Sequence, residues 1–206
     1  MIDIAEIVED LEKIEQEKRY IGSSSVTIFG GSRFKEDSFY YKRAKELGRE
    51  IADLGYSVIT GGSSGIMEAL NSGAITTSSE SKSIGIYIDD LPHEQEPNIY
   101  TDKKLKFNYF FTRKMALINY SDAYIVMPGG FGTLDEFFEV VTLVMTKKHK
   151  PSPIILFDSN YWGKLYSFMN DDMLKYGTIN RDDLNLISLT NSVDEVINII
   201  KNFNKD

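Results

Sequence analysis

The chain has 206 residues, no cysteine and a net charge of −8 at pH 7, which excludes disulfides and thiolate metal sites. The acidic balance argues against nucleic acid as a partner, because proteins that bind a phosphate backbone usually present a basic face. No apolar run approaches the roughly 20 residues that span a bilayer and no basic signal peptide begins the chain, so we expect a cytoplasmic protein with no membrane partner.

Short apolar segments alternate with amphipathic ones along the chain, and each kind has its own period. In chain order the pattern predicts a helix over 4–19, a strand over 26–29, a helix over 38–54, a strand over 57–60, a helix over 65–74, a strand over 83–88, a polar loop over 89–102, a helix over 107–120, a strand over 123–127, a helix over 133–145, a strand over 153–157, a helix over 161–175, a short strand over 186–188 and a helix over 192–203.

This alternation is typical of an α/β protein in which helices cover both faces of a parallel sheet. No internal repeat, low-complexity tract or linker interrupts it. We therefore expect a single Rossmann-like nucleotide-binding domain over residues 1–206, built on an open parallel sheet, with residues 1–20 as an N-terminal helix.

Three of the predicted strands end in paired glycines, namely Gly30-Gly31, Gly61-Gly62 and Gly129-Gly130. In open parallel sheets, ligands bind beyond the carboxyl ends of the strands at a topological switch point. Glycine lets a ligand approach the backbone closely. Tight turns alone could also explain the glycines, but three such turns on one edge favour a ligand groove.

The third glycine pair belongs to the loop Pro128-Gly129-Gly130-Phe131-Gly132-Thr133, which leads from a strand into a helix. Free amides and a partial positive charge at a helix N-terminus suit a phosphate group. The loop lacks the Gly-Lys-Ser/Thr of a Walker motif, and no complete dinucleotide fingerprint is present. We therefore expect this loop to hold the phosphate of a mononucleotide, with Thr133 capping the helix or donating its hydroxyl to the phosphate.

Charged residues near this loop have structural as well as functional interpretations. Thr133 and Glu136 have the spacing of a capping box, in which the glutamate returns to the cap amide, and spacing alone favours that role. Arg113 and Lys114 are adjacent cations, and an arginine fork suits phosphate or ribose oxygens. Without further observations, a solvated helix face explains these two cations better.

Taken together, these segments resemble the LONELY GUY family of cytokinin riboside 5'-monophosphate phosphoribohydrolases, long labelled lysine decarboxylases. Glu94-Gln95 and Tyr109-Phe110-Phe111 look like the family's larger, mostly bacterial branch, whereas Ser63-Ser64 and Leu70 depart from the family pattern. The resemblance covers roughly residues 26–165 and is carried by Gly30-Gly31-Ser32-Arg33, the Gly61 to Ala69 segment, Leu91 to Gln95 with Asn98, Tyr109 to Lys114, and the Pro128 to Glu136 loop.

The resemblance implies that Arg113 and Glu136 are the catalytic pair. It also implies hydrolysis of the N-glycosidic bond of a nucleoside 5'-monophosphate, AMP or N6-modified AMP, to a free base and ribose 5-phosphate, without a cofactor and in a homodimer or larger homo-oligomer. The candidate substrate-binding residues, from the resemblance and from the glycine turns, are Glu94, Lys114, Gly129, Gly130, Phe131, Gly132, Thr133, Thr142, Gly62 and Met67.

Two rival functions share parts of this pattern. A non-catalytic nucleotide-binding or sensing protein would use the same phosphate loop, and only turnover distinguishes the two. A pyridoxal-phosphate decarboxylase would need a lysine motif, for which Lys148-His149-Lys150 is the nearest match, but cations at a helix end explain that run better. We expect no metal site, because His93 and His149 are the only histidines and neither has a ligand-spaced partner.

Overall fold

A computed structural model describes residues 2–21, 24–77, 79–88 and 97–203. Within them, seven parallel strands form one sheet in the order β4-β3-β2-β1-β5-β6-β7. The chain moves outward from β1 to β4 and then returns to place β5 on the other side of β1, so the switch point lies between β1 and β5. The strands are β1 (Ser25–Phe29), β2 (Ser57–Thr60), β3 (Ser83–Ile88), β4 (Lys103–Phe107), β5 (Ala123–Val126), β6 (Ile154–Phe157) and β7 (Ile187–Thr190).

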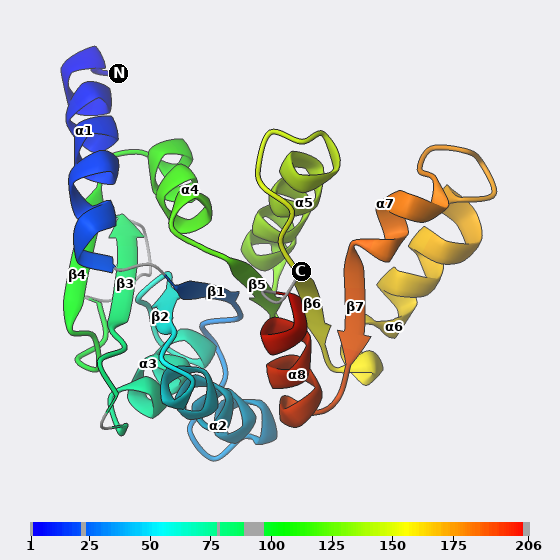
Figure 1. Cartoon of the computed structure of the whole chain (residues 1–206), viewed down its shortest axis with the longest axis horizontal. Coiled ribbons are helices and arrows are strands. Elements are labelled where there is room, and N and C mark those ends of the chain that lie inside the picture. The colour runs from blue at the N-terminus through cyan, green and yellow to red at the C-terminus, as the bar shows by residue number, and fades with distance from the viewer. Residues whose placement is uncertain (1, 22–23, 78, 89–96, 204–206) are drawn as a thin grey trace.

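Helices cover both faces of this sheet, with α2, α3 and α8 on one side and α1, α4, α5, α6 and α7 on the other (Figure 1). Successive strand residues point to opposite faces, so in β1 the side chain of Ile28 enters one core and that of Phe29 the other. The expected Rossmann-like α/β sheet is confirmed. The helices are α1 (Ile4–Ile21), α2 (Phe39–Asp53), α3 (Ile66–Ala74), α4 (Phe110–Asn119), α5 (Phe131–Met145), α6 (Ser159–Ser167), the π-helix η1 (Phe168–Met173), α7 (Arg181–Asn185) and α8 (Val193–Phe203).

The edge strand β4 was not predicted: it occupies residues 103–106, which lie between the expected polar loop and the expected helix 107–120, and the first residue of that helix. Its side chains alternate with a period of two: Leu105 and Phe107 are buried, whereas Lys104 and Lys106 are exposed. Lysines on an edge strand discourage pairing with another chain. The helix therefore begins at Phe110 rather than at residue 107.

The N-terminal helix α1 is anchored to the start of α4 by one buried carboxylate. Asp10 is fully buried and accepts hydrogen bonds from the Asn108 backbone amide at 2.9 Å, the Asn108 side-chain amide at 3.0 Å and the Thr112 hydroxyl at 2.5 Å. A negative charge at a helix N-terminus is favourable. Asp10 thus fixes the first turn of α4, the helix that carries Arg113.

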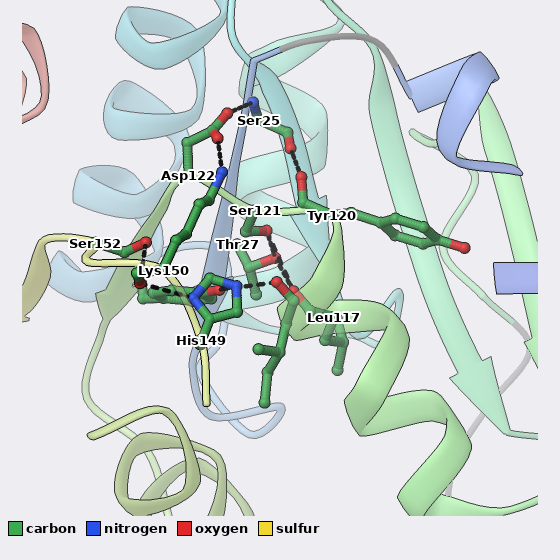
Figure 2. Close-up of polar contacts among 11 residues, drawn as sticks. Ser25, Thr27, Leu117, Tyr120, Ser121, Asp122, His149, Lys150 and Ser152 are labelled. Carbon is green, nitrogen blue, oxygen red and sulfur yellow. Dashed lines mark hydrogen bonds and ion pairs between the residues drawn. The ribbon is translucent and has the colours of Figure 1, made fainter. Parts of the chain in front are cut away.

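A second polar cluster ties the amino-terminal halves of β1 and β5 to the end of α4 (Figure 2). The Thr27 hydroxyl donates to the Leu117 carbonyl at 2.8 Å and lies 2.5 Å from the Ser121 hydroxyl. The Ser25 amide donates to the Asp122 carboxylate at 3.1 Å. This cluster lies at the edge of the sheet opposite the glycine turns, and its groups bond to one another.

The carboxyl-terminal third differs from expectation mainly in its boundaries. The helix expected over 161–175 is α6 continued by η1, the short helix α7 was not predicted, and the strand expected over 186–188 is β7. Asn180 and Asp183 form a capping box that begins α7. This short-range signal could have predicted α7 from the sequence. Among the described residues, no helix is both long and apolar enough to cross a membrane.

Candidate functional site

The glycine loop after β5 leads directly into α5 at the switch point of the sheet. Helix α5 begins at Phe131, two residues earlier than expected, and its N-cap residue is Gly130, which has no side chain to cap the helix. Within the described part of the chain, the amides of residues 130–133 have no hydrogen-bond acceptor. Four free amides and the positive end of the helix therefore meet at one place.

The expected capping box is wrong. Thr133 is the third residue inside α5 and Glu136 is the sixth, so neither stands at the position that the capping box requires. The reason is packing: the buried Thr133 side chain lies directly against Gly129, where an added Cβ would be only 2.1 Å from the Thr133 hydroxyl oxygen. Glu136 is consequently free of the capping role that spacing alone favoured.

Gly130 and Gly132 differ from Gly129 because packing does not require them. A Cβ added at either position would meet no atom within 4 Å, and neither residue has a positive φ. Residues four apart share one face of a helix, so Gly132 lies on the same face as Glu136. The open space beside these two glycines is where a ligand can reach the free amides.

Arg113 is buried, with only 8% of its surface exposed, and it spans the ends of two strands. Its Nε donates to the Ile86 carbonyl of β3 at 2.9 Å, and its Nη2 would lie 2.3 Å from a Cβ added at Gly61 after β2. The solvated-face interpretation is therefore wrong for Arg113, because the first turn of α4 turns this side chain inward over the sheet.

Glu136 approaches the same guanidinium from the other side of the switch point. Its Oε1 lies 3.8 Å from the Arg113 Nη1, which is an ion-pair distance too long for a hydrogen bond. Burial raises the pKa of the Glu136 carboxyl to about 7, although the Arg113 cation opposes this shift. A carboxyl group that titrates near neutral pH beside open amides is typical of a catalytic site.

Lys114 lines a small pocket together with Glu136 and also a second groove along α5. Its Nζ lies 3.0 Å from the Asp135 carboxylate and 2.8 Å from that of Glu139. Burial disfavours its charge, but these two partners together raise the pKa of Lys114. Thr142 lines the same groove, about 16 Å along α5 from Phe131 at 1.5 Å per residue. Contact of Lys114 and Thr142 with a nucleotide stays a prediction.

The remaining predicted residues lie around the end of β2. The Met67 sulfur would lie 2.9 Å from a Cβ added at Gly61, so Met67 and Arg113 flank the same turn. Gly62 has a φ of +75° and packs against Gly85. Phe131 is 93% exposed at the start of α5. Glu94 lies outside the described residues.

Residues 67–200, well over half of the chain, match the family described as "Possible lysine decarboxylase". Proteins named cytokinin riboside 5'-monophosphate phosphoribohydrolase are similar to about 70% of the chain. The chain belongs to the LONELY GUY family.

Two of these relatives show the extent of the similarity. The rice "Cytokinin riboside 5'-monophosphate phosphoribohydrolase LOG" is 26% identical over 145 residues, which cover 70% of this chain and 60% of that protein. The Rhodococcoides fascians "Cytokinin riboside 5'-monophosphate phosphoribohydrolase" is 29% identical over 147 residues, which cover 70% of this chain and 73% of that one. The chain thus spans less than two thirds of the rice protein.

Among solved structures, the molybdenum cofactor binding protein from Rippkaea orientalis has the same fold. It superposes with a TM-score of 0.64 at 24% sequence identity, covering 89% of this chain and 98% of that one. At this identity the likeness concerns the fold alone. The family's arrangement of strands is therefore shared with proteins whose names describe another ligand.

Two residues that shape this site were not among the predicted site residues, although Asn98 is one of those that carry the family resemblance. Asn98 donates from its backbone amide to the Gly62 carbonyl at 2.8 Å and from its side chain to the Asn71 side-chain oxygen at 3.1 Å, so it fixes the β2 turn. The Tyr161 hydroxyl of α6 donates to the Gly129 carbonyl at 2.6 Å. Periodicity cannot reveal such contacts, because they join segments that are distant in sequence. Among the described residues, no group of three or more acidic or histidine side chains is arranged to hold a metal.

Proposed function

We propose that this protein hydrolyses the N-glycosidic bond of a nucleoside 5'-monophosphate, AMP or N6-modified AMP, to a free base and ribose 5-phosphate. One observation carries the proposal: the Arg113–Glu136 pair lies beside the free amides at the start of α5. The names of the relatives support the same class of reaction.

Each part of the site has a role in this proposal. The amides of residues 130–133 bind the 5'-phosphate at the positive end of α5. Arg113 holds the phosphate or ribose and positions the anomeric carbon, because a guanidinium does not release its proton at neutral pH. Glu136, as a carboxylate, orients water and stabilises the positive charge that develops on the sugar, as in glycoside hydrolysis.

The proposal predicts a strict need for the phosphate. Purified protein is incubated with AMP and with adenosine, and the release of free adenine and ribose 5-phosphate or ribose is followed over time. We expect kcat/KM for AMP to exceed that for adenosine by at least about 100-fold, since several charge-assisted hydrogen bonds are lost with the phosphate. Equal values would refute the assignment of the loop, and binding without any turnover would favour a non-catalytic sensor.

We also propose that the chain assembles as a homodimer or larger homo-oligomer. Apolar side chains remain exposed on α4 and α5, including Phe111, Met115 and Phe138. Exposed apolar patches on otherwise folded proteins commonly mark protein interfaces. Light scattering at micromolar concentration should give at least twice the mass of one chain, and the mass of a single chain would contradict this proposal.

A further inference from the structure

The glycine loop presents amides to the ligand only because its carbonyl groups are bound elsewhere. The Pro128 carbonyl accepts a hydrogen bond from the Gly31 amide at 3.0 Å, which ties the loop to the turn after β1. The Gly130 carbonyl accepts from the Leu134 amide at 3.1 Å, the first turn of α5. Carbonyl oxygens carry a partial negative charge, so any of them turned toward a phosphate would repel it.

The carbonyl between these two belongs to Gly129, and a side chain binds it. The Tyr161 hydroxyl donates to this oxygen at 2.6 Å. In a planar trans peptide, the C=O of one residue and the N–H of the next point in opposite directions. The hydrogen bond to the Gly129 carbonyl therefore also sets the direction of the Gly130 amide, the first of the free amides. Glycine on both sides leaves this peptide easy to rotate if nothing holds it.

Tyr161 itself stands on a firmly held segment. Asp158 precedes α6 and caps it, accepting a hydrogen bond from the Asn160 amide at 2.7 Å, and the Asp158 amide donates to the Thr190 carbonyl of β7 at 2.7 Å. The neighbouring Trp162 is buried and donates from its indole to the Val126 carbonyl of β5 at 3.1 Å. The backbone that carries Tyr161 is thus held next to the strand that leads into the loop.

We infer that Tyr161 is a positioning residue of the phosphate site, whose hydroxyl orients the Gly129–Gly130 peptide so that the Gly130 amide donates to the substrate phosphate. This inference rests on the proposed function, because it assigns the phosphate to the free amides of α5. Tyr161 acts through the backbone, and its effect should therefore be confined to ligands that carry a phosphate.

The test compares Tyr161→Phe with wild type in two assays. In calorimetry with ribose 5-phosphate as the probe, we expect the variant to bind about 3- to 10-fold more weakly, the range of one hydrogen bond. In kinetics with AMP, we expect KM to rise by a similar factor while kcat stays within twofold, because the phosphate contact is made equally in the ground and transition states. Any turnover of adenosine should be unchanged.

Tyr166→Phe is the matched control, since Tyr166 lies on the same helix and its hydroxyl has no hydrogen bond to the described residues. It should match wild type in every assay.

If Tyr161→Phe binds ribose 5-phosphate as wild type does, the inference is overturned. A fall in adenosine turnover equal to that for AMP would show a general structural role instead. If wild type binds ribose 5-phosphate but does not hydrolyse AMP, the proposed reaction fails while the calorimetry still decides the role of Tyr161. If wild type binds no ribose 5-phosphate, both proposals are refuted.

Discussion

Polar clusters lie at both ends of the parallel strands, the amino ends (the amino edge of the sheet) and the carboxyl ends (the carboxyl edge). The two clusters have opposite character. At the amino edge, Thr27 and Ser121 share a hydrogen bond and Asp122 accepts a hydrogen bond from the Ser25 amide (Figure 2). These groups therefore satisfy one another's hydrogen bonds. At the carboxyl edge, four amides have no acceptor in the described part of the chain, and the carboxyl group of Glu136 has a raised pKa. Polar groups that lack a protein partner, rather than polar groups as such, therefore mark the carboxyl edge as the candidate site.

The largest effect expected from this contrast is that of Glu136→Gln. Glutamine keeps the shape of the side chain but removes the charge that a cationic transition state requires. We expect kcat for AMP to fall at least about 100-fold, while the melting temperature and the affinity for ribose 5-phosphate stay close to wild type. Unchanged kcat with unchanged affinity would leave Glu136 without a catalytic role.

The dependence of kcat/KM on pH tests the same role of Glu136. The carboxyl of Glu136 has a folded pKa of about 7 against an ordinary value of 4.5. If the carboxylate form is active, kcat/KM should rise about tenfold per pH unit below pH 7 and level off above it. The folded state also binds this proton more tightly than the unfolded chain does, so wild type should lose stability relative to Glu136→Gln as pH rises from about 4.5 to 7. A profile that falls through pH 7 would instead assign Glu136 as an acid.

The glycines of the phosphate loop provide a matched pair of variants with opposite expectations. Gly129→Ala should lower the free energy of unfolding by about 1–3 kcal/mol, because its Cβ would overlap the buried Thr133 side chain. Gly132→Ala meets no neighbour and replaces glycine inside a helix, so it should leave stability unchanged or raise it by up to about 1 kcal/mol. Yet its methyl group enters the ligand space and should weaken AMP binding. Chemical denaturation and calorimetry measure both effects, and normal AMP affinity in Gly132→Ala would place the ligand elsewhere.

Local sequence patterns were enough to predict the parallel sheet, the glycine edge and the loop at the switch point, because each depends on residues close together in the chain. The role of Glu136 was not accessible in this way, since a capping box and a catalytic carboxylate share one spacing. The start of α5 at Phe131 argues against the capping box, and the catalytic role stays a proposal. Arg113 and Tyr161 show the same limit: both contact strands or loops distant in sequence, and no period in the sequence records that contact.

The amino edge provides the control for these variants. Thr27→Val removes a fully buried hydroxyl with little change of shape and leaves the Ser121 hydroxyl to donate to the Leu117 carbonyl alone. We expect a loss of about 0.5–1.5 kcal/mol in the free energy of unfolding with kcat and KM for AMP unchanged at a temperature where the variant is folded. A drop in kcat without a change in KM would show that the two edges are coupled.

The smallest effect is expected at Lys150, the residue that the decarboxylase interpretation would make central. Its side chain is 54% exposed and forms an ion pair with Asp122 at the amino edge (Figure 2). An exposed ion pair of this kind contributes less than about 1 kcal/mol, so Lys150→Ala should scarcely change stability or the hydrolysis of AMP. A pyridoxal-phosphate enzyme would instead form a Schiff base on one lysine. Wild type and Lys150→Ala are therefore incubated with pyridoxal phosphate, reduced with borohydride and analysed by mass spectrometry. We expect no stoichiometric adduct in either protein, and an adduct at one lysine that disappears in Lys150→Ala would move the chemistry to the opposite edge of the sheet.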